Sequence, residues 1–255
     1  MTGKVYLIGA GPGDPDLLTM RALRMLQAAD VVVYDRLVSA EIMEFCPEGA
    51  ELIAVGKCPK NHLVPQERIN EILHEQALAG RKVARLKGGD PMIFGRGSEE
   101  AAYLIERGVE IEYAPGITAA QGASCSTGVP LTHRGLATGV QYVTGHRQQD
   151  KVLDLDWKRL ADPDTTVVVY MGVANIGQIA VGLMTEGLAA STPVMAVSRA
   201  TSAEERRMVS TLGTVAQDSR EAELQAPTLF IIGKVVSLYA EKPQDLAVEA
   251  VSANG

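Results

Sequence analysis

Cysteine is scarce in this 255-residue chain, and its three cysteines include no C-x-x-C pair. Cys46, Cys58 and Cys125 are widely spaced and odd in number, which argues against a disulfide framework and against a cysteine-ligated metal site. We interpret them as reduced thiols. The sequence therefore predicts a cytoplasmic protein that binds no metal.

Long apolar runs and an excess of positive charge are also missing. The only apolar stretch near the N-terminus is interrupted by glycines at residues 9–13, so it is too short to span a membrane. The 24 Lys and Arg residues are outnumbered by 31 Asp and Glu residues, which gives a formal net charge of −7. We therefore expect neither a nucleic-acid partner nor an anionic membrane.

The remaining composition is that of a globular protein, with 46% hydrophobic and 22% charged residues. Short apolar runs predict strands over residues 4–9, 31–34, 51–55 and 83–87, and apolar residues at helical spacing predict helices over 18–29 and 65–79. Ser98 is expected to cap another helix, which carries Glu99 and Glu100 in its first turn and ends at Gly108. This alternation predicts an α/β domain with a mostly parallel sheet over residues 1–114.

The second half of the chain differs in composition and in the order of its predicted elements. Residues 116–139 are rich in small residues and predict a short helix with a loop. Beyond them, one helix is expected over 175–186. The strands expected in this half lie over 140–144, 166–171, 193–198, 206–212 and 228–232. The interval between residues 198 and 206 is too short for a crossover helix, which predicts a mixed sheet. We expect a second α/β domain over 115–240 and a disordered tail over 241–255.

A glycine-rich loop, Gly-Ala-Gly-Pro-Gly-Asp, follows the first predicted strand at residues 9–14. Glycines allow a ligand to approach the backbone closely. However, Asp14 occupies the position where the dinucleotide fingerprint needs glycine, and the Lys and Ser/Thr of a P-loop are absent. The loop is therefore unsuited to pyrophosphate, and a tight turn without a ligand remains an alternative.

A second glycine cluster, RLKGGDP, lies at residues 85–91, at the end of another predicted strand. The carboxyl ends of parallel strands meet at one edge of a sheet, where ligands bind. Two loops that combine glycine with aspartate suit a ligand with hydroxyls, an amino-acid moiety and a positive charge. S-adenosylmethionine has these features.

Six motifs, in this order along the chain, resemble the tetrapyrrole methylase superfamily. They are GAGPGDPDLLT at 9–19, VYDRLV at 33–38, RLKGGDP at 85–91, FGRG at 94–97, PGITA at 115–119 and YMG at 170–172. The resemblance extends from residue 3 to about residue 240 and is strongest to the S-adenosylmethionine-dependent C-methyltransferases that act on uroporphyrinogen III. It implies a homodimer of two-domain chains that methylates this tetrapyrrole twice, through precorrin-1 to precorrin-2.

The resemblance also implies roles for individual residues. The cofactor-binding residues it implies are Pro12, Gly88, Gly89, Asp90, Ile93, Thr118, Ala119, Met171, Ala200 and Thr228. For catalysis, it implies Asp35 as proton acceptor and Lys57 as proton donor, while Arg96 and Glu99 form a second candidate pair near a helix start. The sequence leaves the choice between these two sets open.

Substrate binding requires local positive charge, because the tetrapyrrole implied by the resemblance is rich in carboxylates and the protein is acidic. Arginine binds a carboxylate with two parallel hydrogen bonds. We predict Arg36, Arg134 and His146 as substrate-binding residues, with Arg147 extending this basic group.

Three other functions are compatible with parts of the sequence. Another precorrin methyltransferase of cobalamin synthesis would share the cofactor motifs but differ in its substrate loops. A ribosomal RNA methylase of the same superfamily should be more basic. A nicotinamide-dependent oxidoreductase is disfavoured by Asp14 and by the lack of an acidic ribose partner at the expected spacing.

Overall fold

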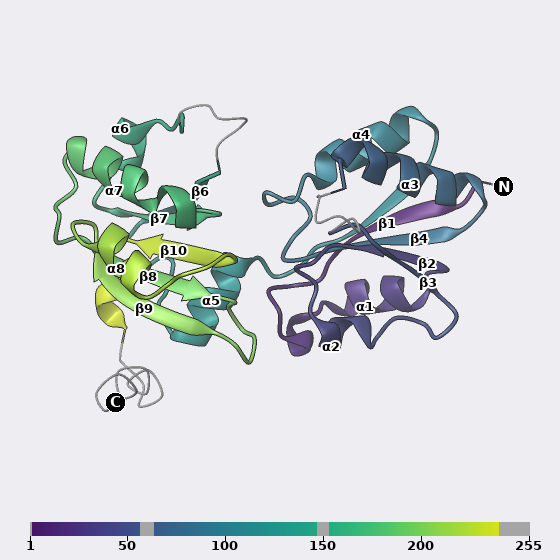
Figure 1. The fold of residues 1–255 in the computed structure, drawn as a ribbon, viewed down its shortest axis with the longest axis horizontal. Coiled ribbons are helices and arrows are strands. Elements are labelled where there is room, and N and C mark those ends of the chain that lie inside the picture. The colour runs from purple at the N-terminus through teal and green to yellow at the C-terminus, as the bar shows by residue number, and fades with distance from the viewer. Residues whose placement is uncertain (1, 57–63, 147–152, 240–255) are drawn as a thin grey trace. The chain divides into compact units, whose positions relative to one another are not determined.

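The computed structural model describes residues 2–56, 64–146 and 153–239. It divides into two compact units, Met1–Gly122 and Ala123–Gly255, both visible in Figure 1. The division falls within helix α5 (Ala119–Thr127), whereas the sequence placed the boundary after residue 114. The tail predicted over residues 241–255 lies outside the described residues.

The sheet of the N-terminal unit is entirely parallel, with the strand order β3-β2-β4-β1-β5. The strands are β1 (Lys4–Gly9), β2 (Val31–Tyr34), β3 (Glu51–Ala54), β4 (Lys82–Lys87) and β5 (Glu110–Ala114). Helices α1 (Met20–Gln27) and α2 (Ala40–Met43) cover one face, and α3 (Gln66–Leu78) and α4 (Gly97–Glu106) cover the other, as Figure 1 shows. The predicted parallel α/β architecture is confirmed.

Both faces of this sheet are buried, which explains why its strands are nearly continuous apolar runs. In β1, Val5 and Leu7 belong to the core beneath α3 and α4, while Tyr6 and Ile8 belong to the core beneath α1 and α2. This alternation follows from the two-residue period of a strand. A rigid layer therefore supports the loops that follow the strands.

The sheet of the C-terminal unit is mixed, with the strand order β6-β7-β10-β8-β9. Its elements are β6 (Gly139–Thr144), α6 (Trp157–Leu160), β7 (Thr165–Tyr170), α7 (Ile176–Thr185), β8 (Pro193–Ser198), β9 (Arg206–Thr211), α8 (Val215–Glu221) and β10 (Thr228–Ile232). Only β6 and β7 pair in parallel; the other neighbours are antiparallel, including the closely spaced β8 and β9. The predicted mixed sheet is confirmed. Single 3₁₀ turns occur at Pro15–Leu17, Val173–Asn175 and Lys234–Leu238.

One local prediction was wrong, and three short helices were not predicted. Ser98 does not cap α4, because the helix already begins at Gly97 with Arg96 at the N-cap. The Gly97 N–H donates to the Pro91 carbonyl oxygen (2.9 Å), so packing within the preceding loop starts the helix earlier. The short helices α2, α6 and α8 were not predicted, because they have only four, four and seven residues and too few apolar positions to show a period.

Candidate active site

The loops that follow β1, β4 and β5 are joined through their backbones at one edge of the N-terminal sheet. The Gly11 N–H donates to the Gly89 carbonyl oxygen (3.1 Å), and the Gly89 N–H donates to the Gly11 carbonyl oxygen (2.7 Å). Gly116 approaches so closely that a Cβ there would lie 2.1 Å from the Gly89 carbonyl oxygen. The two glycine loops identified from the sequence therefore meet, as the parallel sheet predicts.

We expect Gly116→Ala to destabilise the protein, because backbone atoms of Gly89 and Gly9 occupy the space that the new methyl group needs. The loops would have to separate, and the free energy of unfolding should fall by about 2–3 kcal/mol. Gly49→Ala is the control, since nothing lies within 4 Å of its Cβ position. Urea unfolding measures both variants. Equal stabilities of the two variants would contradict this packing argument.

Asp90 fastens the loops after β4 and β5 to each other. Its Oδ1 accepts a hydrogen bond from the Met92 N–H (2.7 Å), and its Oδ2 accepts one from the Gly116 N–H (3.0 Å). The carboxylate therefore links the backbone at Met92 to the backbone at Gly116. Its direct contact with the cofactor remains a prediction.

The loop after β2 reaches the same edge and carries Asp35 and Arg36. Asp35 is half-buried, and its Oδ1 accepts a hydrogen bond from the Leu37 N–H (2.9 Å). A Cβ on Gly88 would lie 2.7 Å from the Leu37 Cβ, so this loop packs directly on the glycine cluster. Arg36 is exposed. The predicted proton donor, Lys57, lies outside the described residues.

Arg96 and Glu99 form a bidentate ion pair at the start of α4. The Arg96 Nε donates to the Glu99 Oε1 (3.1 Å), and the Nη2 donates to the Oε2 (2.6 Å). This bonding raises the pKa of Arg96 and lowers the pKa of Glu99. Arg96 has a φ of 58°, a region that side-chain-bearing residues rarely occupy and that is often found at functional sites. The pair predicted from the sequence does form, with Glu99 orienting the guanidinium.

A buried cluster beside this pair was missed in the sequence. Glu100 is fully buried, and its Oε1 accepts hydrogen bonds from the Lys87 Nζ (2.8 Å), the Arg85 Nε (3.3 Å) and the Gln66 Nε2 (3.0 Å). Burial, followed by the charge of Arg85, lowers the pKa of Lys87. A signal was present: Arg85 and Lys87 lie on one face of a strand otherwise predicted to be buried, so they require a buried carboxylate.

In the C-terminal unit, four predicted residues lie at one edge of the sheet. His146 follows β6 and Met171 follows β7, and these strands end side by side because Thr144 pairs with Tyr170. Ala200 follows β8, and Thr228 begins β10 opposite the end of β8. The Thr228 hydroxyl is buried against Ser198 Oγ (2.5 Å) and also donates to the Gln225 carbonyl oxygen (2.6 Å).

Of the other predicted substrate residues in this unit, Arg134 is not part of this group. Arg134 is exposed in a turn closed by hydrogen bonds between His133 and Ala137, and this turn leads into the amino end of β6. The structure therefore does not bring Arg134 to the edge that holds Met171. Arg147 lies outside the described residues.

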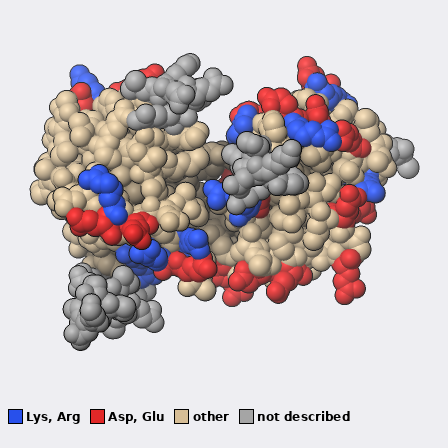
Figure 2. All heavy atoms as spheres, in the orientation of Figure 1, with Lys and Arg blue, Asp and Glu red and all other residues tan. Residues whose placement is uncertain are grey.

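Acidic and basic side chains lie in mixed groups on the face shown in Figure 2. No continuous basic field is visible on this face. Arg36 and Arg96 are exposed and could each offer positive charge to an acidic ligand. Within residues 2–56, 64–146 and 153–239, no group of three His, Cys, Asp or Glu side chains is placed to hold a metal ion. The same residues contain no helix with the length and hydropathy of a membrane span.

The sequence matches the family described as Tetrapyrrole (Corrin/Porphyrin) Methylases over residues 4–216. The chain belongs to the tetrapyrrole methylase family. The methylase is 55% identical over 246 residues to uroporphyrinogen-III C-methyltransferase of Paracoccus denitrificans, covering 96% of this chain and 86% of the relative. It is also 51% identical over 237 residues to a siroheme synthase of Pseudomonas aeruginosa, covering 93% of this chain but only 51% of that relative.

The methylase also resembles a solved structure that contains the reaction product of the cofactor. Uroporphyrin-III C-methyltransferase from Thermus thermophilus in complex with S-adenosylhomocysteine is 42% identical, with a TM-score of 0.80 and coverage of 94% of this chain and 96% of that one. These findings confirm the resemblance and the two-domain α/β fold. They support S-adenosylmethionine-dependent C-methylation over the nicotinamide-dependent alternative.

Proposed function

We propose that the methylase transfers two methyl groups from S-adenosylmethionine to carbon atoms of uroporphyrinogen III, through precorrin-1 to precorrin-2. The observation that carries this proposal is its similarity, over nearly the whole chain, to a relative named for action on this substrate. We also propose that it works as a homodimer in the cytoplasm, without nucleic acid, membrane or metal.

The described residues fit an S-adenosyl ligand. A Cβ on Gly89 would meet only the Ala119 nitrogen, at 3.9 Å, so a ligand can approach this backbone from the open side. Ile93 and Met171 expose apolar side chains, which suit the adenine and methionine parts of the ligand. We propose cofactor contacts at Pro12, Gly88, Gly89, Asp90, Ile93, Thr118, Ala119, Met171, Ala200 and Thr228. When bound, the cofactor supplies a methyl group activated by its sulfonium.

The protein has two tasks in this reaction, which are to hold an acidic ring and to remove a proton. We propose that Arg36, Arg134 and His146 bind substrate carboxylates, with Arg36 offering an exposed side chain in the loop that packs on the glycine cluster. Each methylation also requires the ring to lose a proton. We propose Asp35 and Lys57 as proton acceptor and donor, with the Arg96–Glu99 pair as the alternative set.

Anaerobic incubation with uroporphyrinogen III and methyl-labelled S-adenosylmethionine tests this function. Mass measurement of the product should show the gain of two labelled methyl groups, with one at intermediate times. A product with no added methyl group would refute the proposed substrate, and one that never exceeds a single methyl group would refute the double methylation.

Gly89→Ala should weaken cofactor binding before it affects the fold. Gly89 has a φ of 68°, and alanine there costs about 1–2 kcal/mol of backbone strain beside the proposed cofactor. We expect the Kd for S-adenosylhomocysteine, measured by calorimetry, to rise at least about tenfold. Gly80→Ala is the matched control, because Gly80 also has a positive φ of 80° but follows α3. The same Kd in both variants would argue against a cofactor at Gly89.

A further inference from the structure

The loop that joins β8 to β9, residues 199–205, has a backbone conformation that is rare for residues with a side chain. Arg199 has a φ of 49° and Thr201 has a φ of 66°, so two residues in the left-handed region flank Ala200. A β-branched residue such as Thr201 is seldom found in this region. Such a backbone persists only where its surroundings hold it in place. The loop therefore needs contacts that fix its conformation.

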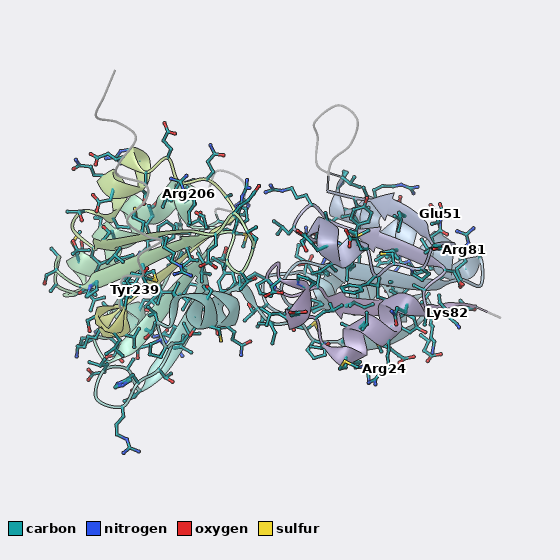
Figure 3. All side chains as sticks on the ribbon, turned by 90° about the horizontal axis from the view of Figure 1, so that it is seen from below. Arg24, Glu51, Arg81, Lys82, Arg206 and Tyr239 are labelled. Atoms are coloured by element: carbon teal, nitrogen blue, oxygen red, sulfur yellow. The ribbon has the colours of Figure 1, made fainter. Side chains whose placement is uncertain are left out.

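Glu205 supplies such a contact from the end of the loop. Its Oε2 accepts a hydrogen bond from the Thr201 N–H (2.6 Å), and its Oε1 accepts one from the Arg207 Nε (2.7 Å). The Arg207 Nη2 lies 2.6 Å from the same Oε1 and also donates to the carbonyl oxygen of Ser126 on α5 (2.9 Å). Figure 3 labels Arg206, the first residue of β9, which lies between Glu205 and Arg207 in the chain. One carboxylate thus links the backbone at Thr201 to a helix.

Pairing of the two strands does not explain this link. β8 and β9 already pair at six positions, along their whole length. The side chains of Glu205 and Arg207 are only 10% and 16% exposed, and removing such groups from water is costly even when they are paired. An exposed residue at position 205 would close the same hairpin without this cost. The buried pair is therefore better explained by the loop conformation that it fixes.

The conformation of this loop bears directly on the proposed cofactor site. Ala200 is a proposed cofactor contact, and it is bonded to Thr201. The Arg199 N–H donates to the Pro227 carbonyl oxygen (3.1 Å), directly before Thr228, which is another proposed contact. A shift of the backbone at Thr201 would therefore move Ala200 and disturb the segment that leads into Thr228.

We propose that Glu205 is a positioning residue of the cofactor site, whose carboxylate holds the Thr201 backbone so that Ala200 can contact S-adenosylmethionine. Arg207 anchors this carboxylate to α5 through Ser126. The inference rests on the proposed function. It assigns Glu205 and Arg207 no contact with cofactor or substrate.

Glu205→Ala tests the proposal, because it removes the carboxylate and leaves the loop otherwise unchanged. The Kd for S-adenosylhomocysteine, measured by calorimetry, should rise about tenfold, the effect of losing one hydrogen bond to a charged group. The KM for S-adenosylmethionine should rise by a similar factor while kcat stays within about twofold, because only binding of the cofactor is weakened.

Two further variants serve as controls. In Glu205→Gln, the amide oxygen can still accept the Thr201 N–H, so the Kd should stay within about threefold of the original value. Glu204→Ala removes the neighbouring glutamate, which pairs with Arg199 at the surface, where the two side chains are 68% and 49% exposed. Because exposed pairs contribute little, the Kd of Glu204→Ala should stay within about twofold.

An unchanged Kd in Glu205→Ala, or an equal rise in Glu204→Ala, would overturn the proposal. Binding by Glu205→Gln as weak as that by Glu205→Ala would also overturn it, because the hydrogen bond to Thr201 would then have no effect. If Glu205→Ala does not fold, Glu205→Met takes its place. Failure of both to fold would count against the proposal as well, because the carboxylate would then serve the stability of the hairpin.

These readouts separate the inference from the proposed function. Absence of methylation of uroporphyrinogen III by the unmodified protein would refute the proposed function, while the Kd values for S-adenosylhomocysteine would still decide the role of Glu205. An unmodified protein that does not bind S-adenosylhomocysteine would refute both.

Discussion

Arg96→Ala should reduce turnover of uroporphyrinogen III by at least about 100-fold, the lower end of what is expected when a group that moves a proton or balances charge is lost. Arg96 is half exposed, and its guanidinium bonds Glu99 at the rim of the loops. The substitution removes the planar guanidinium that would bind a substrate carboxylate, and it leaves Glu99 without its ion-pair partner. The fold should not change, because no buried contact is lost.

Steady-state kinetics and calorimetry together check this expectation. The kcat and KM for the tetrapyrrole report the loss, while the Kd for S-adenosylhomocysteine should stay within about threefold of its original value. Arg107→Ala is the matched control, because Arg107 lies at the other end of α4, where it pairs with Glu106 and covers the ring of Tyr103. Unchanged turnover in Arg96→Ala would remove Arg96 from the proposed site.

Glu100→Ala should destabilise the protein by about 3–5 kcal/mol, the cost found when one partner of a buried ion pair is removed. Among the described residues, Glu100 is the one carboxylate that both Lys87 and Arg85 contact, and neither cation is exposed enough to reach water instead. The truncation also opens a cavity between α4 and the sheet.

Urea unfolding of Glu100→Ala and Glu106→Ala measures this effect. Glu106 lies on the same helix, but its side chain is 77% exposed and its only described ion pair is with Arg107. Loss of an exposed pair should change the free energy of unfolding by less than about 1 kcal/mol. Similar stabilities of the two variants would show that the buried cluster is not a structural requirement.

The sequence alone was sufficient for most of the architecture. The apolar runs of β1 and β2 and the helical spacing in α1 and α3 are local patterns, because each depends on neighbours only a few residues away. The mixed second sheet was also predictable, since the short interval between β8 and β9 excludes a crossover helix. The helices α2 and α8 could not be predicted, because they are too short to show a periodic pattern. The cap predicted at Ser98 was wrong, because packing within the preceding loop starts the helix earlier.

The candidate site divides in the same way. Its glycine loops and the Arg96–Glu99 pair could be identified from the sequence, because a strand end, a glycine and a three-residue spacing are local features. Only the tertiary structure showed that Gly116 packs on Gly89 and that Asp90 ties their loops together. It alone also placed Glu100 opposite Lys87 and Arg85. Such contacts depend on how strands distant in the sequence pair in the sheet, and on the exclusion of water from the space between a sheet and its helices.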